Sequence, residues 1–323
     1  FMDKLKIFSD LSHPKLAQEI CQHLGIKLVF SKITVFGNGN PVAEIFESVR
    51  GADVFVIGTQ APIASENFFA FCVLINALKY ASAGRITAVM PYMFESRSDK
   101  KDRPRISIVA RLVAKFIEKA GADKVVAIDL HSPQIQGFFR LPMNVLDAAP
   151  LLCSHLKNRS FDDYVLVACD SGESKKLDPL RAFLPENLPL AMFDKRRKTL
   201  GGKPEFVDFI GDVAGKTALL VDDEISSGHT IAEALAFLRQ HLPPEKQPKE
   251  VRVMATHPIL CGNAIQTLNE AGIKELLVVE TVPVPLEKIA AAKFEMTVLS
   301  PADLLARAIK IIHEEGSISQ LWK

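Results

Sequence analysis

Two neighbouring carboxylates followed by a short polar loop form the strongest chemical pattern in the chain. Asp222 and Asp223 directly follow the apolar run 217–221, and polar or small residues lead from them into an amphipathic segment: Ser226, Ser227, Gly228, His229 and Thr230. Hydroxyl and N–H donors at a helix start bind phosphate, and the helix dipole favours its charge. The carboxylates suit the hydroxyls of a ribose or a magnesium ion. A helix cap explains the serines but not the double acid, so we expect a site for a phosphorylated ribose.

Two basic segments indicate a ligand with several phosphates. Residues 92–105 follow an apolar run and hold five cations: Arg97, Lys100, Lys101, Arg103 and Arg105. An isolated charge run is usually a solvated loop, whereas a mobile basic loop at a strand end closes over a polyphosphate and excludes water. A second cluster, KRRK at 195–198, follows the apolar run 188–193. Lysine binds phosphoryl oxygens as a point charge and arginine as a two-pronged donor.

A third candidate element combines a histidine and a turn that each follow an apolar run. His131 comes two residues after Asp129, at the end of a predicted strand. A lone histidine is more often structural, but beside another strand end it becomes a candidate contact for magnesium or phosphate. That other end carries the turn Asp170, Ser171, Gly172 and Glu173. Such a turn can present backbone amides to pyrophosphate.

Composition limits the classes of protein that this chain can be. It has 323 residues, 48% of them hydrophobic and 24% charged, and its 39 basic and 38 acidic residues leave a net charge of +1. The length favours two domains. The balanced charge gives no support to nonspecific binding of nucleic acid or of a membrane surface. The apolar run 68–75 is too short to span a bilayer, and five scattered cysteines without a CxxC pair favour a reducing cytoplasm.

Alternating strand and helix patterns predict an α/β fold. Predicted strands are 5–8, 53–57, 86–89, 124–128, 164–168, 217–221, 251–256 and 275–279, and predicted helices are 15–24, 68–81, 107–120 and 231–238. This alternation is typical of βαβ units and mainly parallel sheets. Two doubly wound domains, with a boundary near 142–150, fit the number of strands better than one closed eight-stranded barrel.

Several segments together resemble one enzyme family over nearly the whole chain. The segments are DLHSPQIQGFF, RSDKKDRPR, DKRRK, GDVAGKTALLVDDEISSGHT and ATHPILCGNA. Their order and spacing resemble those of ribose-phosphate pyrophosphokinase, the synthetase of phosphoribosyl pyrophosphate. The resemblance implies two domains of the phosphoribosyltransferase type. It also implies magnesium-dependent transfer of the pyrophosphoryl group of ATP to O1 of ribose 5-phosphate, with release of AMP.

The family's functional residues carry over to matching positions. The resemblance assigns ATP binding to Phe36, Asn38, Asn40, Arg97, Ser98 and Asp99, and catalysis to Lys195, Arg197 and Arg97. It assigns Mg²⁺ contacts to His131 and Asp170, and pyrophosphate binding to 170–173. Ribose 5-phosphate would be held by Asp222, Asp223 and the loop 226–230. The implied domains are an ATP-binding domain at 1–147, a ribose-5-phosphate domain at 148–300, and a segment 301–323 that packs back on the first domain.

Some positions depart from the family pattern and leave alternatives open. Asn40 stands where the family usually has Glu, Ser98 replaces an amide, Glu173 replaces a glycine, and Ser226 replaces a third Asp. These departures motivate a catalytically silent regulatory subunit as the first alternative, and the loop at 226 motivates a phosphoribosyltransferase as the second. The retained Arg97, Lys195, Arg197 and His131 favour the active synthetase.

The resemblance also implies an assembly and its regulation. In this family a neighbouring subunit contributes to the ATP site, so we expect a homo-oligomer, with a dimer as the minimum and a hexamer as a common form. Inhibition by ADP and activation by phosphate are expected from the same source. We expect no nucleic-acid or membrane partner.

Overall fold

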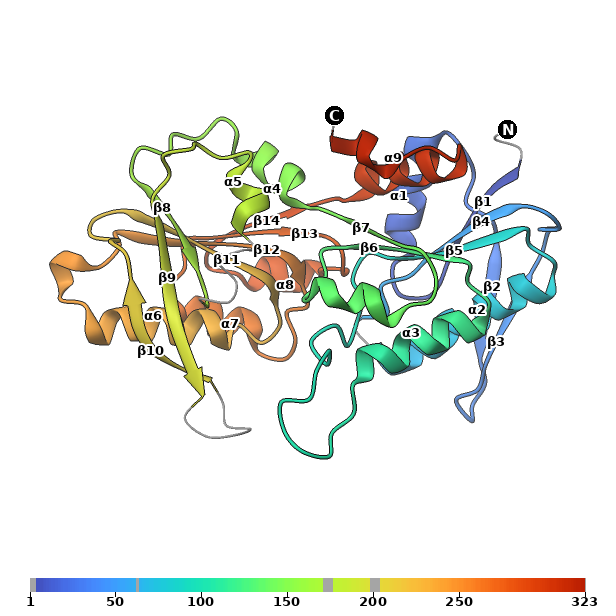
Figure 1. Cartoon of the computed structure of the whole chain (residues 1–323), viewed down its shortest axis with the longest axis horizontal. Helices are drawn as coiled ribbons and strands as arrows, with labels where there is room; N and C mark the ends of the chain where they lie inside the picture. The colour runs from blue at the N-terminus through green and yellow to red at the C-terminus, as the bar shows by residue number, and fades with distance from the viewer. Residues whose placement is uncertain (1–3, 62–63, 171–176, 198–203, 323) are drawn as a thin grey trace. The chain divides into compact units, whose positions relative to one another are not determined.

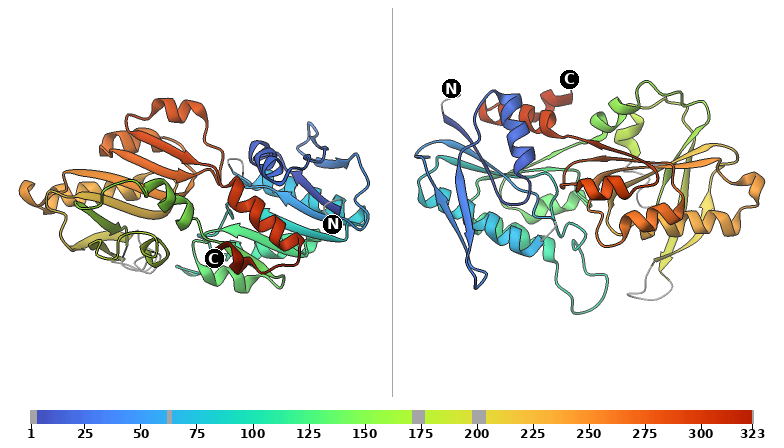
Figure 2. Two further views of the ribbon diagram at one scale, coloured as in Figure 1. Left: turned by 90° about the horizontal axis from the view of Figure 1, so that it is seen from above. Right: turned by 180° about the vertical axis from the view of Figure 1, so that it is seen from behind.

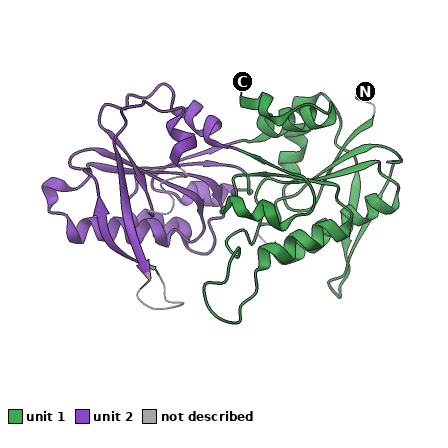
Figure 3. Cartoon of the chain, in the orientation of Figure 1, with its two compact units in different colours: residues 1–146, 281–283, 300–323 green, residues 147–280, 284–299 purple. Residues whose placement is uncertain are grey.

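Short apolar strands alternate with helices throughout the computed structural model, which describes residues 4–61, 64–170, 177–197 and 204–322. The chain forms two compact units (Figure 3). Unit 1 comprises residues 1–146, 281–283 and 300–323, and unit 2 comprises residues 147–280 and 284–299. Two open sheets, rather than one closed barrel, confirm the predicted fold class.

Unit 1 is a five-stranded parallel sheet with helices on both faces. Its strand order is β1-β4-β5-β6-β7, and β2 and β3 form a separate antiparallel hairpin. Helices α1 and α9 cover one face, and α2 and α3 cover the other (Figure 1). The elements are β1 (Leu5–Ser9), α1 (Pro14–Leu24), β2 (Ser31–Val35), β3 (Pro41–Ile45), β4 (Asp53–Ile57), α2 (Ala64–Tyr80), β5 (Arg85–Met90), α3 (Val109–Ala120), β6 (Lys124–Ile128), η2 (Pro133–Phe138), β7 (Met143–Leu146), α9 (Ala302–His313) and η5 (Ile318–Trp322).

Unit 2 is a seven-stranded sheet built in the same way. Its order is β10-β9-β8-β11-β12-β13-β14, and only β10 runs antiparallel to its neighbour among the described strands. Helices α6 and α7 lie on one face and α4 on the other (Figure 1). The elements are α4 (Ala149–Leu156), β8 (Tyr164–Ala168), α5 (Asp178–Arg181), β9 (Leu190–Arg197), β10 (Pro204–Ile210), β11 (Thr217–Ile225), α6 (His229–His241), η4 (Pro244–Lys246), β12 (Glu250–Pro258), α7 (Ala264–Ala271), β13 (Glu275–Val279), α8 (Leu286–Ala291) and β14 (Glu295–Leu299).

The strand sequences explain why both sheets are buried. Strands such as β4 and β8 are continuous apolar runs, DVFVI and YVLVA, as parallel strands covered on both faces require. All five residues of β8 are buried, and so are the last four of β4. Each sheet thus forms the centre of its own hydrophobic core.

The C-terminal helix α9 belongs to unit 1, although unit 2 separates it from that unit in the sequence. It packs against α1, and Figure 2 shows the two helices on the same face of the sheet. Nδ1 of His313 lies 2.7 Å from Oδ2 of Asp53. The guanidinium of Arg85 donates to both oxygens of Asp53, at 2.8 and 2.6 Å, and to the carbonyl of Ile312 at 2.9 Å. A bidentate ion pair with little solvent contact therefore anchors the end of α9 to the start of β4.

The two units share one order of strands. In each, the first strand pairs with the strand that follows a hairpin, giving β1–β4 in unit 1 and β8–β11 in unit 2. The later strands then add outward in chain order. The β2–β3 hairpin of unit 1 corresponds to the β9–β10 hairpin of unit 2, which joins its sheet through β8. Equivalent carboxyl edges, where α/β proteins bind ligands, can therefore be compared directly.

Candidate functional site

The paired acids lie where strand β11 extends beyond its neighbour β8. The predicted strand ended at Val221, but β11 continues to Ile225 because β12 accompanies it, with Asp222 opposite Ala255. Strand β8 pairs only as far as Ala168, opposite Val221. Asp222 and Asp223 are therefore half-buried residues at a step in the sheet edge. Oδ1 of Asp222 accepts a hydrogen bond of 2.9 Å from the backbone N–H of Asp223.

Helix α6 begins directly after the loop that follows the acids. Its first residue is His229, two positions earlier than predicted, and its N-cap is Gly228 with φ +76°. No side chain caps this end, so the first backbone N–H groups are available as donors to an anion. A Cβ atom on residue 228 would lie 3.2 Å from Cγ of Leu268 in α7. Close packing and a left-handed backbone together require glycine at this position.

Lys195, Arg196 and Arg197 of the second basic cluster lie on strand β9, which the sequence patterns did not predict. Strand β9 pairs with β8 through residues 190–192 and then continues as a two-stranded ribbon with β10. Nζ of Lys195 lies 4.3 Å from the ring centroid of Phe206 on β10. This cation–π contact holds a partly buried ammonium group on the ribbon. The neighbouring Arg196 is exposed and pairs with Asp194. The side chain of Arg197 lies outside the described part.

Asp170 completes the group of predicted residues at this edge of unit 2. It is half-buried and follows β8 by two residues. Because β8 lies between β9 and β11, the structure brings the strands that carry Asp170, Lys195 and Asp222 to neighbouring places in one sheet. The remaining residues of the predicted pyrophosphate turn, Ser171, Gly172 and Glu173, lie outside the described residues.

The predicted nucleotide residues of unit 1 lie in two places. Phe36, Asn38 and Asn40 form the exposed turn of the β2–β3 hairpin. The turn is closed by hydrogen bonds from N–H of Phe36 to O of Asn40 (3.0 Å) and from N–H of Asn40 to Oδ1 of Asn38 (3.2 Å). Phe36 is 53% exposed, so its ring is available to a partner molecule.

Arg97, Ser98, Asp99 and His131 follow two adjacent strands of unit 1. The first three come after β5 and His131 comes after β6, and these strands pair in parallel. The Oγ of Ser98 donates to Oε2 of Glu95 at 2.8 Å, while Arg97 is exposed. His131 and Asp170, both predicted to contact magnesium, belong to different units.

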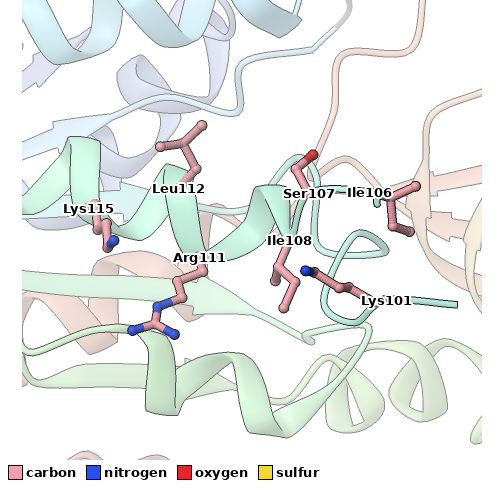
Figure 4. A pocket seen from close by; sticks show the side chains of 7 residues that line it. All are labelled: Lys101, Ile106, Ser107, Ile108, Arg111, Leu112 and Lys115. Carbon is pink, nitrogen blue, oxygen red and sulfur yellow. The ribbon is translucent and has the colours of Figure 1, made fainter. Parts of the chain in front are cut away.

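A basic surface hollow at the start of α3 was not recognised from the sequence. It has a volume of about 450 Å³ and is lined by Lys101, Arg111, Lys115 and four further residues (Figure 4). Lys101 belongs to the predicted basic loop, and Arg111 and Lys115 stand one helical turn apart on α3. The i, i+4 spacing of Arg111 and Lys115 was the feature of the sequence that could have revealed this hollow. Three cations around one hollow attract anions.

The carboxyl edge of unit 1 that corresponds to the acidic edge of unit 2 is closed. Oδ1 of Asp10, directly after β1, accepts hydrogen bonds from Oγ of Ser12 (2.5 Å) and from its backbone N–H (2.8 Å). Oγ of Ser12 in turn accepts from the N–H groups of Thr59 (2.9 Å) and Gln60 (3.3 Å), which follow β4. Burial raises the pKa of Asp10 to about 7, although hydrogen bonds from Ser12 and His13 lower it.

The closed edge also contains buried polar atoms beyond these bonds. Oδ2 of Asp10, Oγ1 of Thr59 and both amide atoms of Gln60 are buried without a hydrogen-bond partner among the described residues. Gln60 has φ +64°, which is a strained backbone for a residue other than glycine. A Cβ on Gly58 would lie 2.3 Å from Oδ2 of Asp10. Asp10 therefore fits only because residue 58 has no side chain.

No helix in the described ranges combines the length and the apolar character that crossing a membrane would need. In the same ranges, no three or more His, Cys, Asp or Glu side chains gather as a ready-made metal cluster.

Paired acids, a helix start and a basic ribbon lie on neighbouring elements of one sheet in unit 2, an arrangement typical of α/β proteins that bind anionic ligands at a carboxyl edge. Comparison with known proteins names the family. Residues 5–121 match the family model for the N-terminal domain of ribose phosphate pyrophosphokinase, and residues 187–323 match that of the phosphoribosyl synthetase-associated domain. The chain belongs to the ribose-phosphate pyrophosphokinase family.

Full-length relatives agree with this assignment. The ribose-phosphate pyrophosphokinase of Caldanaerobacter subterraneus is 41% identical, with 100% of this chain and 99% of the relative covered. That of Bacillus subtilis is 39% identical, with 98% and 97% covered. The crystal structure of phosphoribosylpyrophosphate synthetase from Mycobacterium smegmatis has a TM-score of 0.87 and 37% identity, and the match covers 97% of this chain and 100% of that one.

Proposed function

We propose that this chain is a ribose-phosphate diphosphokinase, which transfers the pyrophosphoryl group of ATP to O1 of ribose 5-phosphate. The single observation that carries the proposal is the edge of unit 2, where two half-buried acids precede an uncapped helix start. Full-length similarity to ribose-phosphate pyrophosphokinases supports the same reaction over phosphoribosyl transfer, the alternative that consumes the product.

Unit 2 is proposed to hold the sugar phosphate. Asp222 and Asp223 accept hydrogen bonds from the ribose hydroxyls, because ionised carboxylates are strong acceptors. The 5-phosphate takes the place of the missing side-chain cap at the start of α6, where loop residues 226–230 supply hydroxyl and N–H donors. The close packing of Gly228 on α7 supports this role, since it keeps the loop in one conformation.

Lys195, Arg197 and Arg97 are proposed as the cations of the transfer step. O1 of ribose 5-phosphate attacks the β-phosphorus of ATP and loses its proton, while the bond from that phosphorus to the α-phosphate oxygen breaks and AMP departs. Such a step needs alignment and positive charge rather than a covalent intermediate. The fixed position of the Lys195 ammonium over Phe206 supports its assignment, because a charge that needs no reorganisation stabilises the transition state best.

Unit 1 is proposed to supply the nucleotide contacts. The exposed turn with Phe36, Asn38 and Asn40 suits stacking and hydrogen bonding to an adenine. Arg97, Ser98 and Asp99 contact the same ATP. The basic hollow with Lys101 and Arg111 supports the attraction of a polyphosphate to this unit.

Mg²⁺ is proposed as the cofactor, held by His131 and Asp170. The half-buried Asp170 carboxylate at a strand end is an oxygen donor of the kind that Mg²⁺ prefers. Mg²⁺ is commonly bound by one or two carboxylates together with substrate phosphates, so a ready-made protein cluster is not required. When bound, the ion neutralises phosphate charge and orients the transferred group.

A homo-oligomer, at least dimeric, is proposed as the working form. Large apolar side chains are exposed along the β2–β3 hairpin and its flanks: Phe30, Val35, Phe36, Val42 and Phe46. The ring centroids of Phe30 and Phe46 lie 4.9 Å apart. Exposed large apolar side chains gathered on one element are typical of a subunit contact. Light scattering after size-exclusion chromatography measures the assembly, and assays with added ADP or phosphate test the expected regulation.

One assay separates the candidate activities. Purified protein is incubated with Mg²⁺, ATP and ribose 5-phosphate, and AMP is measured with and without the sugar phosphate. AMP that forms only with ribose 5-phosphate is the expected result. Absence of AMP, together with binding to an active synthetase, would support a regulatory subunit. Release of pyrophosphate from phosphoribosyl pyrophosphate and a base would support a transferase.

A further inference from the structure

A loop that has no assigned role lies against the phosphate loop of unit 2. Residues 259–263 connect β12 to α7, and the N–H groups of Leu260 and Cys261 donate to the carbonyls of Ile225 and Ser226, both at 2.9 Å. The side chains meet as well, because Oγ of Ser226 lies 3.3 Å from Sγ of Cys261. Backbone and side chain of Cys261 thus both contact the first residue of the phosphate loop.

The position of this cysteine is fixed by the fold around it. Leu260 is 1% exposed, and its backbone is left-handed with φ +49°. Its carbonyl accepts a hydrogen bond of 2.7 Å from Nζ of Lys288 in α8. The carbonyl of Cys261 accepts from N–H of Ala264, where α7 begins. The burial of Leu260, its carbonyl contact with the Lys288 ammonium group and the start of α7 therefore hold the loop in place.

The contact between thiol and hydroxyl selects one orientation of the Ser226 side chain. A serine hydroxyl rotates freely unless a partner holds it, and the sulfur of a cysteine can act as a weak donor or a weak acceptor. Both groups are neutral, so the pair adds no negative charge next to a bound phosphate.

We infer that Cys261 is a positioning residue for the sugar phosphate: its thiol and its backbone N–H hold Ser226 in the conformation that binds the 5-phosphate. The inference rests on the proposed binding of ribose 5-phosphate by the loop 226–230. Cys261 itself is exposed, so its truncation removes little buried apolar surface. An effect on substrate binding can therefore be separated from an effect on folding.

Kinetics of matched variants test this role. We expect Cys261→Ala to raise the KM for ribose 5-phosphate about threefold to tenfold, the effect of losing one hydrogen bond, while kcat and the KM for ATP change less than about twofold. Cys261→Ser restores a hydroxyl partner and should return the KM close to that of the original chain. Adding Cys261→Ala to Ser226→Ala should change the KM little further, because both substitutions break one contact.

Several kinetic results would overturn the inference. They are an unchanged KM in Cys261→Ala, an equal rise for Cys261→Ser, and fully additive effects in the double variant. Cys72→Ala, which alters a partly buried thiol of α2 in unit 1, is the matched control and should leave the KM for ribose 5-phosphate unchanged. A lower kcat together with higher KM values for both substrates would indicate a purely structural role for Cys261 and would also contradict the inference.

Thiol labelling gives a readout that does not depend on turnover. All five cysteines lie in the described part, and Cys261 is the exposed one. Burial raises the pKa of Cys21 to about 11 and of Cys72 and Cys153 to about 12, which keeps these thiols protonated near pH 8. Iodoacetamide should therefore alkylate Sγ of Cys261 first, with iodide as the leaving group.

Ribose 5-phosphate should slow the alkylation of Cys261 at least about threefold, as followed by mass spectrometry of the labelled peptide, whereas ribose alone should not. Protection with no AMP formation would leave the positioning role in place and refute the synthetase activity. Equal labelling rates with and without ribose 5-phosphate, in a protein that does form AMP, would refute the positioning role alone.

Discussion

The two units present equivalent carboxyl edges that are used in opposite ways. At the edge of β1 and β4, unit 1 buries its own carboxylate, Asp10, against Ser12, Thr59 and Gln60. At the edge of β8 and β11, unit 2 leaves its acids half-buried, beside a helix start that no side chain caps. The strand order is the same in both. Side chains at these strand ends, rather than topology, therefore make the two edges different.

Burial explains the difference between the two edges. Asp10 is 4% exposed, and desolvation favours its neutral form. Its hydrogen bonds come from neighbouring groups of the protein. Asp222 and Asp223 are only partly buried, and in the proposed site their oxygens accept hydrogen bonds from the ribose hydroxyls. The comparison predicts that substitutions of the paired acids in unit 2 change substrate kinetics, while substitutions at Asp10 and Gly58, at the edge of β1 and β4 in unit 1, change stability.

The largest expected effect belongs to the ribbon of unit 2. Lys195→Ala should lower kcat by about 10² to 10³, because it removes a preorganised charge from the transition state, while the KM for ATP changes less than about threefold. Initial rates of AMP formation measure both quantities. Arg196→Ala, at an exposed neighbouring position, is the control. Near-normal turnover with lost ATP binding in Lys195→Ala would contradict the assigned role.

The paired acids should give the next largest effect. Replacing Asp222 and Asp223 together by Asn should raise the KM for ribose 5-phosphate about 10-fold to 100-fold, because each amide still accepts a hydrogen bond but loses about 1 kcal/mol of charge assistance. The exposed Asp212, replaced by Asn, is the control and should leave the KM unchanged. An equal rise in the KM for ATP would show that the pair does not discriminate between the substrates.

Asp10→Asn should change stability and its pH dependence instead of kinetics. The pKa of Asp10 is raised from 3.8 to about 7 in the folded state, so the folded state holds the proton more tightly than the unfolded state. Its contribution to the free energy of unfolding is full below about pH 4 and is lost as pH rises to about 7. At pH 8 the Asn variant should be more stable by about 1 to 4 kcal/mol.

Chemical denaturation at several pH values between 4 and 8 measures this difference. The gain in stability of Asp10→Asn should shrink toward acid pH, while the KM for ribose 5-phosphate stays the same throughout. A gain that is independent of pH would mean that Asp10 has the same pKa in the folded and unfolded states, which would contradict the effect of burial.

Two glycines give the smallest and most direct comparison. Gly58→Ala forces a Cβ within 2.3 Å of Asp10 and should lower the free energy of unfolding by about 1 to 3 kcal/mol without affecting substrate KM. Gly228→Ala should cost about 1 kcal/mol for its positive φ and raise the KM for ribose 5-phosphate. Thermal unfolding measures the two stabilities, and steady-state kinetics measures the KM. A raised KM in Gly58→Ala together with an unchanged KM in Gly228→Ala would contradict the comparison.

The sequence was sufficient for the central strands and for the acidic loop, and insufficient where context decides. Strands 53–57, 124–128, 164–168 and 275–279 coincide with those observed because apolar runs bounded by polar residues mark buried parallel strands. The hairpin strands β2, β3, β9 and β10 were missed. No residue of β2 or β3 is fully buried, and β9 joins a short apolar run to the charged residues 194–197. Edge strand β14 and the short β7 were missed as well.

Functional residues divide in the same way. The pattern DD followed by SSGHT is local, so the sequence reveals it. Asp10 and Gly58 are 48 positions apart. Only the contact between them explains why residue 58 is a glycine. The spacing of residues could not assign a role to Cys261, because the inferred role depends on its contact with Ser226, which lies 35 positions earlier in the chain. Long-range pairs of single residues are invisible to periodicity and spacing.

The saturation of AMP formation by ribose 5-phosphate, measured side by side in three proteins, tests the central claim most directly. The original chain and Asp10→Asn should give superimposable curves, while the Asp222→Asn, Asp223→Asn double variant should need about 10 to 100 times more sugar phosphate. A chain that forms no AMP with ribose 5-phosphate, or a curve for Asp10→Asn that shifts as far as that of the double variant, would contradict the account.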